Sequence, residues 1–288
     1  MKKHLSTILL ILMLLAGLSL LLYPSFSDYW NSFHQSRAIA TYAETVAELD
    51  EDRYEEIRSA AEQYNAALPH KENRYILSDQ DRAAYEELLN VGGDGIMGYI
   101  EIPAINCYLP VYHGTDEAVL QIAIGHIEGT SLPVGGESTH CVLSGHRGLP
   151  SAKLFTDLDQ LTEGDTFILR VLDEMFTYEV DQILIVLPHE LEALGIEQGQ
   201  DLCTLVTCTP YGINSHRLLV RGHRVENAEE AKLVRVTSDA VQIEPIIVAP
   251  IVAAPILLVM LIWLMLPRGR KTKKTGKGGE LPYDKTEK

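Results

Sequence analysis

Residues 204–212 read Thr-Leu-Val-Thr-Cys-Thr-Pro-Tyr-Gly, and their order predicts a strand that ends in a tight turn. β-Branched residues favour the strand, and the Pro-Tyr-Gly that follows ends it. Cys208 therefore lies at a predicted strand end, where a side chain can point into a cleft. A buried core cysteine is the commoner alternative for an isolated cysteine, so a chemical role for Cys208 needs support from other residues.

Similar short strands are predicted throughout residues 96–226, each bounded by Gly or Pro turns. They cover residues 97–103, 107–112, 140–144, 166–171, 177–186, 201–208 and 217–221. Short helices are expected between them at residues 115–125 and 153–161. Many short strands separated by turns predict a mainly β domain, built as a barrel or a sandwich.

The region ahead of the β domain, residues 24–95, is predicted to be helical. Ala, Glu and Tyr dominate residues 36–68, with apolar residues at helical intervals, and Pro69 ends this predicted helix. A second short helix is expected to start at Ser78 or Asp79, ahead of a glycine-rich boundary with the β domain.

Two apolar segments, residues 5–23 and 246–266, are each about long enough to span a bilayer. Lysines precede the first segment and a dense basic run follows the second, so both termini are expected in the cytoplasm of a two-pass protein of the cell membrane. No small-x-small cleavage site follows the first segment, which is therefore expected to remain as an anchor. The predicted plan is an anchor at 1–23, a helical stalk region at 24–95, an extracytoplasmic β domain at 96–226, a spacer at 227–245, a membrane helix at 246–266 and a basic tail at 267–288.

The composition of the 288-residue chain is that of a folded protein, with 46% hydrophobic and 22% charged residues. A formal net charge of −16 argues against nucleic-acid binding, which needs a basic surface. The four cysteines, Cys107, Cys141, Cys203 and Cys208, have no Cys-x-x-Cys or zinc-ligand spacing. A disulfide can form between them outside the cytoplasm, and the sequence leaves the pairing open.

His146 is the predicted partner of the Cys208 thiol. It follows a predicted strand within Leu-Ser-Gly-His-Arg-Gly at residues 143–148, and the flanking glycines leave space around its ring. A nearby imidazolium favours the thiolate form of a cysteine, which is the nucleophile. The rival histidines of the same domain are expected to be structural or exposed: His113, His126, His140, His216 and His223.

Arg217 is predicted to lie beside Cys208, because a turn at residues 210–215 would join two antiparallel strands. A guanidinium at that place can hold a carbonyl and stabilise the oxyanion of a tetrahedral intermediate. Arg221 and Arg224 are alternatives that lie further from the turn, and an exposed charge at a strand edge is the non-catalytic interpretation.

These motifs resemble those of a known family. Residues 204–208 resemble the Thr-Leu-x-Thr-Cys motif of sortases, residues 144–147 resemble the stretch that holds their histidine, and Arg217 lies where their arginine is expected. The longer strings at residues 109–115, 129–136 and 208–217, together with the second apolar segment, resemble class C sortases, the pilus-assembling enzymes of Gram-positive bacteria.

The resemblance covers residues 23–266 and implies an eight-stranded β-barrel with Cys208, His146 and Arg217 as catalytic residues. Cys208 would attack the Thr–Gly bond of a Leu-Pro-x-Thr-Gly sorting signal on a pilin or surface protein, forming a thioester, and His146 would protonate the leaving amine. A pilin lysine would then accept the acyl group. Thr207 and Leu205 are the implied substrate-binding residues, and no metal or organic cofactor is implied.

The chain departs from the class C pattern at the lid that usually precedes the barrel. That lid carries an Asp-Pro-aromatic triplet, whereas no Asp-Pro pair occurs in this chain. The lid position corresponds to residues 69–85, where the lid is expected to be absent, reduced or anchored by other chemistry. Our hypothesis from the missing triplet is an open cleft with an accessible Cys208.

Three other functions fit parts of the sequence. A housekeeping sortase would join proteins to the cell wall, and a papain-like peptidase or an L,D-transpeptidase would also use a cysteine. Papain-like chains place the cysteine ahead of the histidine, whereas here His146 precedes Cys208. A non-catalytic membrane scaffold would need neither His146 nor Arg217.

Overall fold

The computed structural model describes residues 2–71 and 73–227. The predicted spacer beyond residue 227, the second membrane helix and the basic tail lie outside the described residues. The described chain from residue 15 onward belongs to one compact unit, which contains all the strands.

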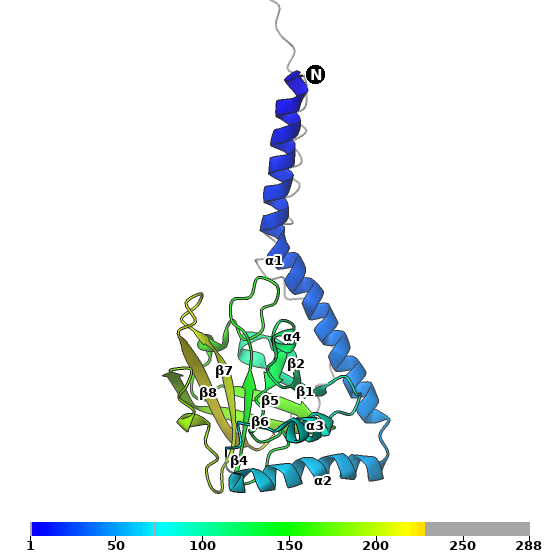
Figure 1. Ribbon diagram of the computed structural model, residues 1–288, viewed down its shortest axis with the longest axis vertical. Helices are drawn as coiled ribbons and strands as arrows, with labels where there is room; N and C mark the ends of the chain where they lie inside the picture. The colour runs from blue at the N-terminus through cyan, green and yellow to red at the C-terminus, as the bar shows by residue number, and fades with distance from the viewer. Residues whose placement is uncertain (1, 72, 228–288) are drawn as a thin grey trace, which may run out of the picture. The chain divides into compact units, whose positions relative to one another are not determined.

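Eight strands close into a barrel in the order β1-β2-β3-β4-β7-β8-β6-β5 (Figure 1). The β2–β3 and β4–β7 pairs are parallel and the other six are antiparallel. The mainly β prediction is therefore confirmed, as a barrel and not a sandwich. The strands are β1 (Ile96–Ile102), β2 (Cys107–His113), β3 (Ile124–His126), β4 (Thr139–Ser144), β5 (Thr166–Val171), β6 (Glu174–Val186), β7 (Asp201–Thr209) and β8 (His216–Val225).

Two predicted helices inside the barrel domain were wrong in extent. The segment at 115–125 contains only the short α4 (Glu117–Leu120), and then the chain enters β3. The segment at 153–161 forms turns and the 3-10 helix η3 (Leu158–Gln160). β3 has three residues, too few to show a strand period, and it exists because β2 and β4 hydrogen-bond to it from both sides.

Three helices precede the barrel: α1 (Lys2–Ala47), α2 (Glu51–Ala67) and α3 (Asp79–Glu87), with the 3-10 turn η1 (Leu68–His70) after α2. The continuous helix predicted for 36–68 is interrupted, because the Asp50 side chain accepts a hydrogen bond from the Arg53 amide and starts a new helix. Ser78 caps α3 in the same way, as predicted. The helix also continues through Pro24, where the predicted anchor ends.

Part of α1, within Ile8–Ala47, is long and apolar enough to cross a membrane. Its C-terminal half packs against the barrel. The Gln35 side-chain amide donates to the Ile122 carbonyl at 2.6 Å, and the Tyr42 hydroxyl donates to the Met97 carbonyl at 2.9 Å. Side chains of α1, α2 and α3 thus belong to the same hydrophobic cluster as the barrel core, among them Tyr42, Ile57 and Tyr85.

The two faces of the β4–β7 pair bury different groups of side chains, because successive residues of a strand point to opposite sides. Cys141, Leu143, Cys203 and Leu205 point into the barrel core. On the outer face, a separate apolar cluster is buried beneath the β6–β7 connection, residues 187–200. We call it the outer cluster, and it consists of Val142, Leu194, Val206 and Leu219.

Candidate active site

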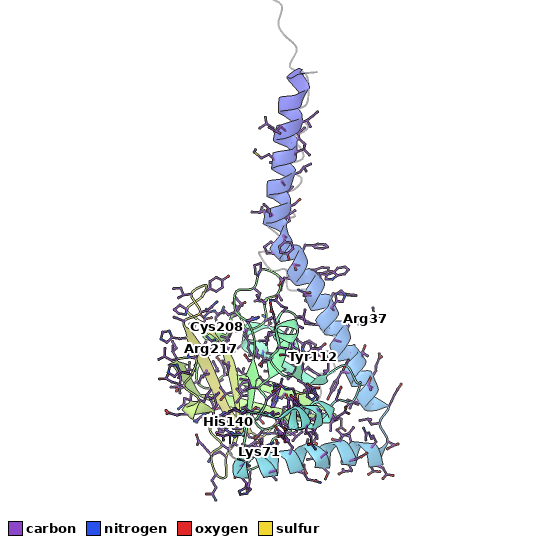
Figure 2. The ribbon with its side chains drawn as sticks, viewed as in Figure 1. Arg37, Lys71, Tyr112, His140, Cys208 and Arg217 are labelled. Carbon is purple, nitrogen blue, oxygen red and sulfur yellow. The ribbon has the colours of Figure 1, made fainter. Side chains whose placement is uncertain are left out.

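Cys208 and Arg217 are direct neighbours across the β7–β8 pair. They face each other in the antiparallel register, as the predicted hairpin requires, and both side chains are half-buried (Figure 2). The turn between them closes through hydrogen bonds from the Ile213 and Asn214 amides to the Pro210 carbonyl. The hairpin therefore brings a thiol and a guanidinium to the same end of the sheet.

His146 lies on the other side of Cys208, just past the end of β4. β4 and β7 run parallel, and their last register pair is Ser144 with Val206. The Gly145 amide continues the ladder by donating to the Val206 carbonyl at 3.0 Å. Two residues further along each chain, this register brings His146 to the level of Cys208. Strand alternation places the Cys208 and Arg217 side chains on the outer face, and His146 follows the end of the neighbouring strand β4.

The backbone around His146 is held on both sides. The Thr207 hydroxyl donates to the Gly145 carbonyl at 2.8 Å, and the Phe155 amide donates to the His146 carbonyl at 3.1 Å. A Cβ atom at Gly145 would lie 2.7 Å from the Phe155 ring and 3.0 Å from Ile124. Only glycine fits there, so this small residue and one buried hydroxyl fix where the histidine leaves the strand.

The loop after His146 contacts the β7–β8 turn next to Cys208. The Arg147 guanidinium lies 5.8 Å from the centre of the Tyr211 ring and forms an ion pair with Asp159. The same ring packs against Gly148, where a Cβ atom would lie 2.9 Å from it. The sequence analysis missed Arg147 and Tyr211, although the basic residue after the histidine and the aromatic residue after the cysteine both belong to the quoted motifs.

The two residues predicted to bind substrate, Leu205 and Thr207, point away from Cys208. Leu205 is fully buried in the barrel core, and Thr207 is buried with its hydroxyl engaged by Gly145. Alternation along the strand places them on the inner face, whereas Cys208 shares the outer face with Val206. Any direct contact of either with a substrate stays a prediction. The apolar side chains on the same face as Cys208 are those of the outer cluster.

The rival residues are engaged elsewhere. His126 is buried, with one ring nitrogen 2.8 Å from the Tyr85 hydroxyl, and the buried His140 contacts the Thr204 hydroxyl at 2.7 Å. Arg221 forms ion pairs with carboxylates, and Arg224 lies over the Phe176 ring. Figure 2 shows His140 far along the barrel from Cys208 and Arg217. These histidines are structural, as expected.

The segment at the lid position has its described contacts on the flank of the barrel. The Arg74 guanidinium donates to the Leu194 carbonyl at 3.0 Å, and the Arg74 backbone passes so close to Gly129 that a Cβ atom there would clash. Lys71 pairs with Asp81 across the same segment. Within residues 2–71 and 73–227, no group of three or more His, Cys, Asp or Glu side chains could hold a metal ion.

Comparisons with known proteins agree with this fold. The family model "Sortase domain" matches residues 100–225. Sortase C1 from Streptococcus agalactiae is 53% identical with a TM-score of 0.65, and the match covers 67% of this chain and 100% of that one. Sortase C from Streptococcus pneumoniae is 46% identical with a TM-score of 0.60, covering 66% of this chain and 97% of that one.

Sortase C from Clostridium perfringens, solved with the C-terminal cell wall sorting motif, is 41% identical with a TM-score of 0.59. That match covers 67% of this chain and 100% of the solved one. Among curated proteins, Sortase D of Bacillus subtilis (strain 168) is 32% identical over 131 residues, which are 44% of this chain and 63% of that protein. The chain thus spans less than two thirds of this relative's length.

Proposed function

The chain belongs to the sortase family, with class C sortases as its structural neighbours, and from this membership we propose that it polymerises pilins outside the membrane. In this proposal Cys208, His146 and Arg217 are the catalytic residues of a cysteine transpeptidase. The donor is a protein with a Leu-Pro-x-Thr-Gly-like sorting signal, and the acceptor is a lysine amine of a second pilin subunit.

The placement of Cys208 opposite Arg217, with His146 at the end of the neighbouring strand, carries this proposal. The Cys208 thiolate attacks the carbonyl carbon of the threonine in the sorting signal, and the negative charge that forms on the carbonyl oxygen is stabilised by the Arg217 guanidinium. The C–N bond to glycine then breaks, and protonated His146 gives its proton to the departing amine. A thioester remains between Cys208 and the threonine carbonyl.

The second half of the reaction returns the enzyme to its starting state. A lysine amine attacks the thioester carbonyl and loses a proton to His146, which is now neutral. The C–S bond breaks, an isopeptide bond forms, and the thiolate leaves beside Arg217. One amide bond is broken and one is formed, so the transfer needs neither ATP nor an external oxidant.

The outer cluster offers a place for the apolar half of the signal. Val206 precedes Cys208 by two residues on the same face of β7, and Leu219 follows Arg217 by two residues on β8. Both side chains are covered by the β6–β7 connection, so a Leu-Pro segment would lie at the exposed edge of this cluster, next to Cys208. The β6–β7 connection packs on this cluster through Leu194, so we expect it to form one wall of the binding groove.

Two features support the acceptor and the location. The Streptococcus pneumoniae sortase C structure is described in terms of pilin substrate specificity, and the Clostridium perfringens enzyme was solved with a sorting motif. The apolar stretch of α1 supports membrane anchoring at the N-terminal end. A second membrane helix at 246–266 completes the proposed two-pass arrangement, with both termini in the cytoplasm.

Intact mass spectrometry of the full chain in detergent tests the chemistry. A sorting-signal peptide should add the mass of its acyl half to the wild-type chain and to Cys107→Ala, and should add nothing to Cys208→Ala. A pilin with an acceptor lysine should then give a ladder of isopeptide-linked products. A single shifted product with a cell-wall amine would instead indicate a housekeeping enzyme, and no adduct with any sorting signal would rule out both.

A further inference from the structure

Cys141 and Cys203 form a second pair of sulfur-bearing residues that the transfer reaction does not use. They are register partners in the parallel β4–β7 pair, both belong to the inner face, and both are buried in the barrel core. The two thiols lie close enough that each shifts the pKa of the other. Both are reduced in the structure.

The backbone geometry at this pair is that of a bridgeable site. Neighbouring strands lie about 4.8 Å apart, and the Cα atoms of a disulfide are usually about 4.4–6.8 Å apart. Two cysteines that are register partners on the same face of neighbouring strands therefore need no large backbone movement to form a bond. Cys107 lies on β2, away from this pair, and has no other cysteine as its register partner.

We propose that Cys141 and Cys203 form a disulfide that crosslinks the two strands holding the catalytic cysteine and histidine. The proposal rests on the extracytoplasmic placement given under the proposed function, because disulfides persist in oxidising compartments. Cys141 precedes His146 by five residues, and Cys203 precedes Cys208 by five. A bond at this level joins β4 to β7 directly below the catalytic end of the sheet.

The oxidant is a disulfide of a small molecule or of a thiol–disulfide oxidoreductase, and it acts before the barrel closes over the pair. One protein thiolate attacks a sulfur of the oxidant and expels the first thiolate, leaving a mixed disulfide. The second protein thiolate then attacks the protein sulfur of that mixed disulfide and expels the other thiolate. Two protein thiols are oxidised, and one oxidant disulfide is reduced to two thiols that take up the protons.

Strand alternation separates this bond from the nucleophile. Cys203 points into the core, whereas Cys208 belongs to the outer face of the same strand. The catalytic thiol is therefore not positioned to exchange with a Cys141–Cys203 bridge. The sheet can in this way hold one oxidised pair and one free, reactive cysteine in the same compartment.

The number of cysteines alkylated in the wild-type full chain, with and without prior reduction, tests whether the Cys141–Cys203 disulfide forms. The chain is exported to an oxidising compartment, or refolded in detergent with glutathione disulfide, and is then alkylated under denaturing conditions. Denaturation is needed because burial raises the pKa of the Cys203 thiol, which slows alkylation of the folded chain whether or not the bond exists. We expect two alkylated cysteines without prior reduction, four after reduction, and one linked peptide pair that contains Cys141 and Cys203.

Four alkylated cysteines without reduction, or a linkage that involves Cys107 or Cys208, would overturn the proposal. Reduction should also lower the melting temperature of the wild type by about 10 °C, since the bond closes a long loop. Reduction should have no such effect on Cys141→Ser, whereas Cys107→Ser should respond like the wild type. If Cys141→Ser does not fold, the wild-type count still decides. Acylation of Cys208 by the peptide is measured separately, so its failure would leave the disulfide result intact.

Discussion

Two groups of three residues from β7, β8 and the segment that contains β4 have almost the same composition. Each contains a histidine from the β4 segment, a residue of β7 with a thiol or hydroxyl, and the arginine of β8 that is its register partner. The lower set consists of His140, Thr204 and Arg221, and the upper set consists of His146, Cys208 and Arg217.

The two sets differ in what surrounds them. In the lower set, His140 is held between the Thr204 hydroxyl and the Gly195 carbonyl, each at 2.7 Å, and Arg221 is paired with Asp181 and Glu197. The β6–β7 connection covers this level, and both His140 and Thr204 are 1% exposed. Every polar group of the lower set is thus occupied by the protein itself.

The upper set lies where the strands end, and its side chains keep hydrogen-bonding capacity that other parts of the protein do not occupy. The Arg217 guanidinium donates only to the carbonyls of Asn214 and His216, and within residues 2–71 and 73–227 no carboxylate pairs with it. Cys208 is half-buried at the same level. The comparison indicates that position along the strand, more than residue type, separates the structural group from the proposed catalytic one.

The largest expected effect comes from moving the cysteine from position 208 in the upper set to position 204 in the lower set. Cys208→Ala should lower the rate of acyl-enzyme formation by at least about a thousandfold, because no thiolate remains to attack. Adding Thr204→Cys to this variant should restore nothing, since position 204 is covered by the β6–β7 connection. Intact mass after incubation with a sorting-signal peptide measures both. Acylation of the residue introduced at 204 would contradict the comparison.

The arginines give the next largest contrast. Arg217→Ala should lower kcat/KM for acylation by about 10²–10³-fold, because the donor to the developing oxyanion is lost. Arg221→Ala serves as the matched control on the same face of β8, and it should change stability more than rate, since its partners are Asp181 and Glu197. Steady-state cleavage of a fluorogenic sorting-signal peptide would measure both variants. Equal losses of rate in the two variants would show that the upper and lower sets do not differ in function.

Much of this site could be predicted from local sequence. The hairpin between Cys208 and Arg217 followed from a strand, a Pro-Tyr-Gly turn and a second strand, all within a few residues of each other. The position of His146 beside this hairpin did not follow in the same way, because β4 and β7 pair in parallel across a long separation in the chain. There the resemblance to a family pointed to the histidine, and the register supplies the physical reason.

The sequence alone could not rank the candidate histidines and arginines, because the burial and hydrogen-bond partners of each side chain are set by segments distant in the chain. Both ring nitrogens of His140 are occupied by hydrogen bonds with Gly195 of the β6–β7 connection and Thr204 of β7, so His140 is not available as a catalytic residue. Thr207 lies inside a motif that predicts substrate binding, yet its hydroxyl donates to the Gly145 carbonyl from the inner face of the strand. The sequence shows that neighbouring side chains of a strand point to opposite faces. It does not show which of the two faces lines the barrel interior, because that depends on how the barrel closes.

Thr207→Val tests whether this residue acts on substrate or on the histidine. Valine has nearly the same shape but cannot donate to the Gly145 carbonyl, so the chain before His146 should lose its anchor. We expect kcat to fall about tenfold with KM little changed, and the free energy of unfolding to fall by about 1 kcal/mol. Thr207→Ser keeps the hydroxyl and should stay close to wild type. A raised KM with unchanged kcat would instead indicate direct substrate binding.

The smallest expected effect is a pH dependence that belongs to the lower set. Burial lowers the pKa of His140, and the nearby Arg221 and Arg74 lower it further, while the hydrogen bond to the Gly195 carbonyl acts in the opposite direction. The folded chain therefore keeps this histidine neutral at a pH where the unfolded chain, with an ordinary pKa of about 6.5, already binds a proton. Because the unfolded state holds more protons, stability falls as the pH drops below that value.

Urea unfolding at pH 7.5 and 5.5 measures this effect, with His140→Gln as the comparison. Glutamine cannot titrate in this range, so the variant should lose less stability on acidification than the wild type, by a difference on the order of 1 kcal/mol. The other titrating groups are the same in both chains and cancel in that difference. If the two chains lost equal stability, His140 would not be held neutral by its surroundings, and the lower set would not be the closed counterpart of the active site.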